Sequence, residues 1–404
     1  MNFANRLTFM CKDVLIIFGG VVANTRTSSM FVCLLLLAGC SPFDAPDDMM
    51  EEYVERVGRV LELAPVFSEI PDVKPLPRPR DRTLAIPVTE LGMLDFLSLY
   101  GCELQRVVGE KASIMGRVMQ PLNRLRYEVR FIQAARKCLP SIENEELASD
   151  LQKAIASKQK SLPLAIWNAT WGVEEIESLF TSAKGRLPVE APASAELTND
   201  LRQLNQTVAA LNAGQLDQDL DYLGNVHQSW LSEHKAGQLI NSARLVIARL
   251  TDGTGLIAQR LEGRPLCIGG QPNEQARIVQ SMFFSVYIEK IQPYLASVRR
   301  HRDTVVAPLT ELATQQREVM PASFESYYRT TLSVTAEDGL WQRLDKAVQQ
   351  HTEAWQSLLE QCGMRPTAQA RKRNASTLAF RRHPKDFLDR GLASRDLLGS
   401  AQAQ

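Results

Sequence analysis

The chain has 404 residues, 45% of them hydrophobic, and its 46 Lys and Arg residues equal its 46 Asp and Glu residues in number. This composition is typical of a globular protein whose length can bury a sizeable core in one or two domains. Residues 40–364 contain 34 basic and 42 acidic residues, and this negative balance gives no reason to expect a nucleic-acid partner.

The first segment, residues 1–39, has the pattern of a signal peptide. An apolar run at residues 30–36 precedes the sequence Leu-Ala-Gly-Cys-Ser at residues 37–41. This sequence resembles the lipobox of bacterial lipoprotein precursors, which implies cleavage before Cys40 and acylation of Cys40. The apolar run is far shorter than the ~20 residues of a membrane-spanning helix. An ordinary export signal with an unrelated cysteine is the alternative. A second apolar run at residues 14–23 suggests that the genuine start lies later in the chain.

A lipid anchor on Cys40 would determine where the protein works. The three acyl chains of such an anchor exceed the two that suffice for stable attachment to a membrane. Ser41 follows the cysteine, and in the lipoprotein family this implies sorting to the outer membrane, with the inner membrane as the alternative. We therefore expect a domain that faces the periplasm and is bound to the outer membrane through Cys40.

After a short tether, the sequence predicts one helix and then an extended strap. Residues 47–63 have apolar side chains at helical spacing and acidic residues in the first turn. Six prolines lie between residues 65 and 87, so residues 65–88 are expected to run extended, partly as polyproline II. A ligand for an SH3-like domain is one interpretation. The interspersed apolar residues favour a strap across the helices.

Residues 91–118 and 121–139 predict a helical hairpin with its apex near residue 120. Residues equally distant from the apex should face each other, and Cys102 and Cys138 satisfy this rule. The same register brings Glu110 to Arg130 and Glu103 to Lys137. Exposed ion pairs contribute little energy, so the charge match supports the register without adding much stability.

The remainder of the chain is predicted to be helical, with almost no strand signal. Residues 186–195, which contain two prolines, form the best internal linker and leave open a division into two helical lobes. A glycine-rich turn at residues 252–255 and a loop at residues 263–272 interrupt the second half. Further helices are expected at residues 142–161, 163–182, 195–212, 215–232, 233–249, 273–316, 324–332 and 338–361. The predicted fold class for residues 40–364 is an all-α, multi-helix bundle built from helical hairpins.

Single residues mark the expected kinks and ends of the later helices. Pro293 and Pro308 should kink or break the helix at residues 273–316, because proline cannot supply the backbone N–H donor. Asp338 is the predicted N-cap of the last helix, and Gly363 is its predicted stop.

The cysteines indicate two disulfides. Removal of the leader and use of Cys40 as the lipid carrier leave an even set in an oxidising compartment. This set is Cys102, Cys138, Cys267 and Cys362. Of the three connectivities, the hairpin register favours the pairs 102–138 and 267–362. Metal binding is the competing interpretation, but no Cys-x-x-Cys motif or suitably spaced histidine supports it.

Searches for chemistry yield weak candidates and no catalytic residue, metal site or cofactor motif. His227 and His234 are seven residues apart, but no third ligand accompanies them, so a pair of surface histidines is favoured over zinc. Trp167 and Trp171 are four residues apart and could line a ligand groove between helices; packing in the core is favoured for them.

The C-terminal segment, residues 365–404, differs in character from the rest. It contains nine basic and three acidic residues among Ala, Ser, Thr and Gln. Contact with anionic lipid or lipopolysaccharide is one interpretation. A disordered C-terminus or a translational extension is the simpler one.

Six short motifs carry a resemblance to a known family. They are Leu94-Asp95-Phe96-Leu97, Cys102-Glu103-Leu104, Gly116-Arg117-Val118-Met119, Tyr127-Glu128, Cys138 and Gln292-Pro293. Together they resemble a family of uncharacterised bacterial lipoproteins that contain a domain of unknown function. The resemblance covers residues 40–362 and implies a fold and a location, but no catalytic residues.

Three classes of function follow from the sequence. The leading class is a non-enzymatic interaction or assembly factor of the cell envelope, because long helical hairpins offer extended faces to an envelope protein partner. A binding module for an apolar or envelope-derived ligand, with a pocket near Trp167 and Trp171, is the alternative. An enzyme whose site is assembled from distant residues is the third.

The lipobox makes a direct prediction about the mature protein. Mass spectrometry of the protein from its membrane fraction should find Cys40 as the first residue, carrying acyl chains, because the signal peptidase cuts before the acylated cysteine. An unmodified N-terminus, or one that begins at another residue, would contradict the lipoprotein interpretation.

Overall fold

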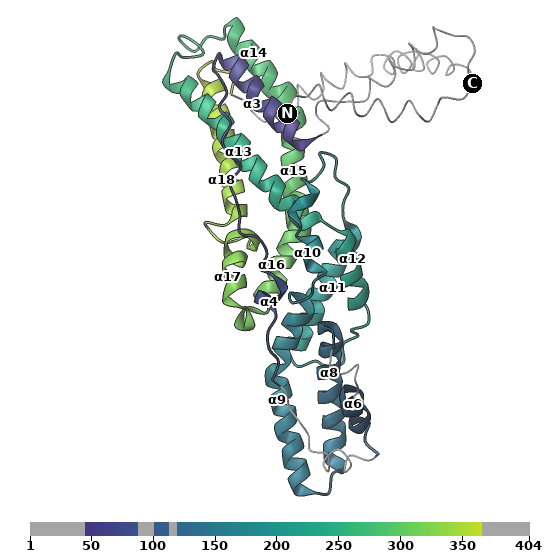
Figure 1. Cartoon of the computed structure of the whole chain (residues 1–404). Coiled ribbons are helices and arrows are strands. Elements are labelled where there is room, and N and C mark those ends of the chain that lie inside the picture. The colour runs from purple at the N-terminus through teal and green to yellow at the C-terminus, as the bar shows by residue number, and fades with distance from the viewer. Residues whose placement is uncertain (1–44, 88–100, 113–118, 366–404) are drawn as a thin grey trace, which may run out of the picture. The chain divides into compact units, whose positions relative to one another are not determined.

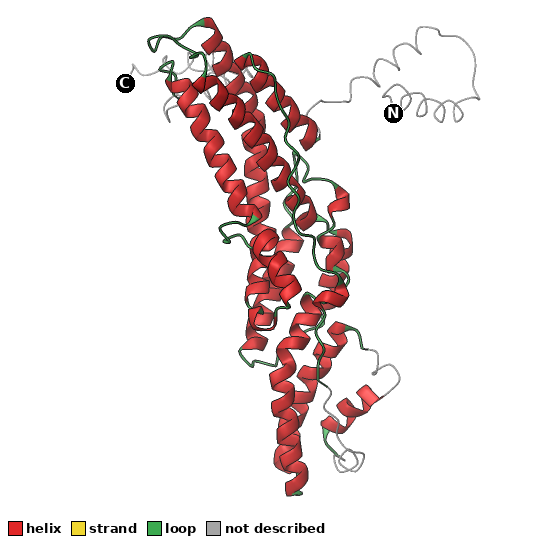
Figure 2. Cartoon of the chain, turned by 60° about the vertical axis from the view of Figure 1, so that its left-hand side comes forward, coloured by secondary structure: helices red, strands yellow, loops and turns green. Residues whose placement is uncertain are grey.

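A computed structural model describes residues 45–87, 101–112 and 119–365 of the chain. Every regular element in these ranges is a helix (Figures 1 and 2), which confirms the predicted all-α fold class. The leader, Cys40 and the basic segment after Arg365 lie outside the described residues, as do parts of the predicted helix at residues 91–118.

The elements begin and end as follows. The α-helices are α3 (Pro46–Leu61), α4 (Pro79–Arg82), α6 (Glu103–Ala112), α8 (Pro121–Cys138), α9 (Glu145–Thr170), α10 (Ile176–Leu179), α11 (Ala195–Asn212), α12 (Leu223–Ser232), α13 (Lys235–Glu262), α14 (Glu274–Met282), α15 (Gln292–His301), α16 (Ala307–Thr314), α17 (Ala322–Tyr327) and α18 (Leu340–Glu360). The π-helical segments are η3 (Phe283–Ile291), η4 (Arg302–Val306) and η6 (Tyr328–Leu332). Short 3-10 turns are η1 (Leu139–Ser141), η2 (Ser182–Lys184) and η5 (Arg317–Val319).

Helices α6 and α8 pack in the register that the sequence predicts. The sulfur atoms of Cys102 and Cys138 are 1.94 Å apart, which is bonding distance. Farther along the pair, Arg130 Nη1 donates to Glu110 Oε2 at 2.8 Å. The second pair, Cys267 and Cys362, has its sulfur atoms 1.97 Å apart and joins the loop after α13 to the end of α18.

Helices α8 and α9 form a hairpin whose interface contains a fully buried ion pair. Lys158 Nζ lies 2.8 Å from Glu128 Oε2, and neither side chain is exposed. Arg124 Nε lies 2.6 Å from the other carboxylate oxygen of Glu128. Two cations therefore compensate the buried carboxylate, since a single uncompensated charge in a core costs several kcal/mol.

Helix α9 continues through Pro163, although the sequence predicts a break between residues 161 and 163. An internal proline costs about 3 kcal/mol in helix stability. The side chains of Leu162, Ile166 and Trp167 are all buried on the same helix. Their burial outweighs the local cost, because one large apolar side chain contributes roughly 1.5–3 kcal/mol.

A neutral histidine connects helices α3, α13 and α18. His351 of α18 is fully buried, and its Nε2 lies 2.5 Å from Tyr53 Oη of α3. Its Nδ1 lies 2.9 Å from Thr254 Oγ1 of α13, a hydroxyl that donates to a backbone carbonyl. Trp355 Nε1 donates to Tyr53 Oη at 2.8 Å. These partners fit one tautomer, with the proton on Nδ1 and an acceptor at Nε2.

The predicted glycine-rich turn at residues 252–255 is wrong, because these residues belong to helix α13. Gly253 lies in the middle of this helix and faces His351. A Cβ atom on Gly253 would lie 3.0 Å from His351 Cε1. The glycine therefore serves close helix packing and does not form a turn.

The two predicted kinks are confirmed as changes of helix type. The π-helical segment η3 ends just before Pro293, and η4 ends just before Pro308. A wider turn accommodates a residue that cannot donate a backbone hydrogen bond. Tyr287 of η3 stacks on Tyr53 with ring centroids 5.7 Å apart, so this segment also joins the His351 cluster.

Two predicted helix starts are wrong for local reasons. Helix α12 begins at Leu223 and not at residue 215, because Asp219 Oδ1 accepts from the backbone N–H of Asp221 at 2.8 Å and favours a turn. The N-cap of α18 is Gly339 and not Asp338. The predicted stop at Gly363 is confirmed by its left-handed φ of 63°.

Residues 63–78, which contain most of the predicted strap, form neither helix nor strand. Backbone groups of this segment meet side chains of α13: Arg249 Nη1 donates to Ser68 O at 3.1 Å, and Arg244 Nε donates to Pro71 O at 2.6 Å. The short helix α4 follows and begins with Pro79, a position where proline favours a helix. Val88 lies outside the described residues.

The predicted linker at residues 186–195 is tied to several helices. Arg186 Nη1 lies 2.6 Å from Asp47 Oδ2 of α3, and the backbone N–H of Leu187 donates to Ser242 Oγ of α13 at 2.9 Å. A division of the helical domain into two lobes at this segment stays a prediction.

The His351 cluster predicts a pH-dependent stability. Burial lowers the pKa of His351 to about 3, so between pH 6.5 and pH 3 the unfolded chain binds a proton that the folded chain does not. Protonation of His351 in the unfolded chain should therefore lower the free energy of unfolding by about 2 kcal/mol when the pH falls from 7 to 5. Urea unfolding of the wild type and of His351→Gln checks this expectation.

The variant should be less stable at pH 7, because it loses hydrogen bonds to Tyr53 and Thr254. It should also lose that part of the pH dependence. An equal fall in stability between pH 7 and pH 5 for both proteins would show that His351 does not titrate as a buried neutral group.

Candidate functional site

Helix α12 lies between two pockets and contributes residues to both. The first has a volume of ≈ 500 Å³ and is lined by Glu196, Leu197, Asn225, Gln228, Ser229, Leu231, Ser232 and Glu233. The second has a volume of ≈ 510 Å³ and is lined by Pro79, Thr83, Gln120, Pro121, Leu122, Asn123, Gly172, Val173, Glu174, Glu175, Gly224, His227 and Gln228. Gln228 lines both pockets, so one exposed helix separates them.

The sequence of α12 gives the helix one buried and one exposed face. Leu223, Val226, His227 and Trp230 are buried. Positions 225, 228, 231 and 232 are exposed, at the spacing that places residues on one side of a helix. One of these exposed residues is apolar: 46% of the surface of Leu231 is accessible.

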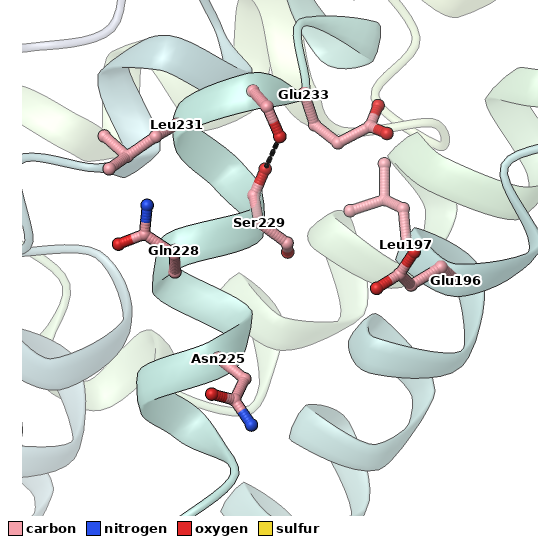
Figure 3. A pocket seen from close by; sticks show the side chains of 8 residues that line it. Glu196, Leu197, Asn225, Gln228, Ser229, Leu231 and Glu233 are labelled. Carbon is pink, nitrogen blue, oxygen red and sulfur yellow. Dashed lines mark hydrogen bonds between the residues drawn. The ribbon is translucent and has the colours of Figure 1, made fainter.

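The two sides of α12 differ chemically, as Figure 3 shows. Gln228 and Leu231 extend on one side, and the carboxylates of Glu196 and Glu233 lie on the other side, near Leu197. Ser229 Oγ of the same helix lies 3.3 Å from Asp200 Oδ2. Burial, with a smaller contribution from Glu196, raises the pKa of Asp200.

Four carboxylates around α12 have no ion-pair partner among the described residues. They are Glu174 and Glu175 in the second pocket and Glu196 and Glu233 in the first. Glu177, two residues further along, differs because Arg82 Nη1 lies 3.1 Å from its Oε1. The surface around α12 therefore has carboxylates without a direct ion pair, although Arg82 is near enough to Glu174 to interact with it electrostatically.

The two candidate histidines do not form a pair. His227 Nε2 lies 2.9 Å from Ala169 O, and His234 Nδ1 lies 2.9 Å from Ser178 O. His227 is only 6% exposed, so the prediction of a surface pair is wrong for this residue. Burial is the largest cause of the lowered pKa of His227. Among the described residues, no group of three or more His, Cys, Asp and Glu side chains could hold a metal ion.

Trp167 and Trp171 are core residues in the structure. Both indole rings are fully buried, and neither residue lines either pocket beside α12. Their ring centroids lie 5.0 and 4.8 Å from that of Phe324. The ligand groove that the sequence leaves open at these residues is not found there, because aromatic neighbours occupy the space.

Arg82 positions the α4 wall of the second pocket. Its guanidinium is fully buried, and its Nε donates to Trp171 O at 2.6 Å. Its Nη2 donates to Val173 O at 2.9 Å. These carbonyls follow the C-terminal end of α9, where a cation is favoured by the helix dipole. The same arginine therefore holds α4 and the turn after α9 in place beside α12.

Sequence reasoning missed α12 as a site. The only signal in the sequence was a leucine, Leu231, among polar residues on the face that is exposed. This pattern is common on surface helices. The carboxylates at residues 174, 175 and 196 belong to segments far from α12 in the sequence, so only the fold brings them together.

Comparison with protein-family models places the chain in a family. Residues 50–366 match the model described as "Protein of unknown function (DUF3080)", and the chain belongs to this family. No curated protein and no solved structure matches the chain. None of the described helices combines the length and the apolar character needed to cross a membrane.

The Arg82 contacts predict a large local effect. Arg82→Met should destabilise the protein by about 3 kcal/mol, because it leaves buried carbonyls after α9 without donors. Chemical denaturation measures this change. Arg80→Met is the matched control, since the side chain of Arg80 is 75% exposed and lies 3.7 Å from Asp81. Equal effects of the two substitutions would contradict a specific role of Arg82.

Proposed function

We propose that the protein is a lipid-anchored envelope protein that faces the periplasm and acts by binding a protein partner. The proposed contact region, the α12 surface, consists of the exposed α12 residues with the carboxylates beside them. Its members are Asn225, Gln228, Leu231, Ser232, Glu174, Glu175, Glu196 and Glu233.

The location rests on the sequence of the leader. Residues 37–41 resemble a lipobox, and Ser41 after the cysteine favours the outer membrane. The two cysteine pairs at bonding distance suit an oxidising compartment, in which such bonds persist. The anchor, the compartment and the membrane are all parts of the proposal.

The binding role rests on one observation: Leu231 is exposed at the edge of the first pocket, on a helix flanked by carboxylates that form no ion pair among the described residues. An apolar anchor surrounded by polar groups is a common arrangement in protein interfaces. Groups at the rim give specificity and speed association more than they raise affinity. The α12 surface offers both kinds of group, and its carboxylates form no ion pair among the described residues.

A second candidate function is the binding of a small polar ligand in the pocket beside His227. Its volume of ≈ 510 Å³ falls in the range of ~300–1,000 Å³ typical of ligand sites. The lining includes Gln120, Asn123, Glu174 and Glu175. These groups favour a polar or cationic ligand over the apolar ligand that the sequence suggests as an alternative.

Co-purification after cross-linking tests the partner proposal. The lipidated wild type should retain a protein partner in a fixed ratio. Leu231→Asp should reduce the captured amount at least tenfold, because it places a charge at the apolar centre of the contact. Ile278→Asp is the matched control, since Ile278 of α14 is 48% exposed and lies on another helix.

Each outcome of this experiment decides between the candidates. Loss of the partner with Leu231→Asp and retention with Ile278→Asp support the α12 surface. Equal capture by the two variants overturns it. A retained small molecule without a protein partner, lost in a Glu175→Gln variant, would favour the second candidate. Cys40→Ser should release the protein from the membrane fraction, and continued attachment would contradict the anchor.

A further inference from the structure

We infer that the basic C-terminal segment of this chain docks on the α12 surface and competes there with the partner. The inference rests on the proposed function, because it takes the α12 surface as a docking surface. It names residues 365–404, the tail, as the segment that occupies the surface when no partner is bound. The inference is based on complementary charge, on complementary apolar groups and on the distance that the extended tail can span.

The charges of the two regions are complementary. Glu174, Glu175, Glu196 and Glu233 contribute negative charge and form no ion pair among the described residues. Arg82 interacts electrostatically with Glu174 and offsets part of this charge, and Lys235 follows Glu233 by two residues in the sequence. The segment at residues 365–404 contains nine basic and three acidic residues. The opposite net charges attract at moderate ionic strength and are screened at high salt.

The segment also offers apolar side chains beside its charges. Phe380 directly precedes Arg381 and Arg382, and Phe387 follows Lys385 by two residues. The exposed Leu231 is the apolar group that such a side chain could cover. A short stretch of the tail thus combines an apolar anchor with cations, as the α12 surface combines Leu231 with carboxylates.

The distance from residue 365 to the α12 surface determines which part of the tail can dock. Helix α13 has 28 residues and a length of ~42 Å at 1.5 Å per residue. It begins just after α12, and the loop at its other end is joined to α18 through Cys267 and Cys362. Arg365, the last described residue, therefore lies about one length of α13 (~42 Å) from the α12 surface.

Only the more distant of two basic clusters can span this distance. The near cluster consists of Arg371, Lys372 and Arg373, and the far cluster consists of Arg381, Arg382 and Lys385. Counted from residue 365, a fully extended chain reaches ~28 Å at residue 373 and ~55 Å at residue 381. The far cluster can reach the α12 surface, and the near cluster cannot.

Intramolecular docking needs little intrinsic affinity. A tethered segment has an effective concentration on the order of 1 mM at its site. A contact with a dissociation constant near that value is then about half occupied. A partner that binds more tightly displaces the segment, so the tail would act as a weak competitor for the α12 surface.

Carbodiimide cross-linking of the full chain tests this inference, because it joins lysine amines to carboxylates in direct contact. Lys385 should be linked to carboxylates of the α12 surface, as peptide mapping by mass spectrometry can show. Lys372 is the internal control and should be linked at least fivefold less. The links from Lys385 should disappear at high salt. Equal linkage of both lysines, or none from Lys385, overturns the inference.

Charge reversal gives a second test with a matched control. Replacement of all three far-cluster residues by Glu should increase partner capture severalfold, because the competitor is removed. The same replacement of the near cluster should leave capture unchanged. Tail peptide bound to phosphatidylglycerol vesicles, without links to α12, would identify a lipid surface as the occupant instead. If Leu231→Asp still abolishes partner capture, the proposed function stands even when the tail inference fails.

Discussion

The fold depends on a buried, neutral imidazole that connects segments almost three hundred residues apart in the chain. His351 accepts from Tyr53 near the start of the helical domain and donates to Thr254 in its middle. Gly253 allows α13 to approach this ring, and the π-helical segment η3 brings Tyr287 against Tyr53. Each of these features is unfavourable or neutral locally. Together they satisfy every polar group of the imidazole, and a satisfied polar network specifies one arrangement of helices.

Much of the fold could be predicted from the sequence because it is encoded by local spacing. The register of α6 and α8 follows from the positions of Cys102 and Cys138 around the apex, and the breaks before Pro293 and Pro308 follow from the missing N–H donor. Gly253 and Pro163 were misread because tertiary packing overrides local propensity there. No local pattern reports that a glycine faces a histidine of another helix.

The candidate site was less predictable than the fold, since it depends on relations between distant segments. The spacing of Trp167 and Trp171 favoured core packing and left a ligand groove open, and both residues are fully buried in the core. Arg82, in a proline-rich segment with no obvious role, supports the wall of that pocket by binding the turn after α9. A buried guanidinium thus holds the turn after α9, and His227 of α12 contacts Ala169 O at the end of α9, while the exposed face of α12 has few features that distinguish it from other surface helices.

The segment at residues 186–187 connects the first described helix to the α12 end of α13. Asp47 of α3 contacts Arg186, and Leu187 is hydrogen-bonded to Ser242, seven residues into α13. At 1.5 Å per residue, Ser242 lies about 10 Å from the start of α13, which follows α12 in the chain. Residues far apart in the sequence therefore meet near the α12 end of α13, and no local pattern in α3 or α12 alone predicts these contacts.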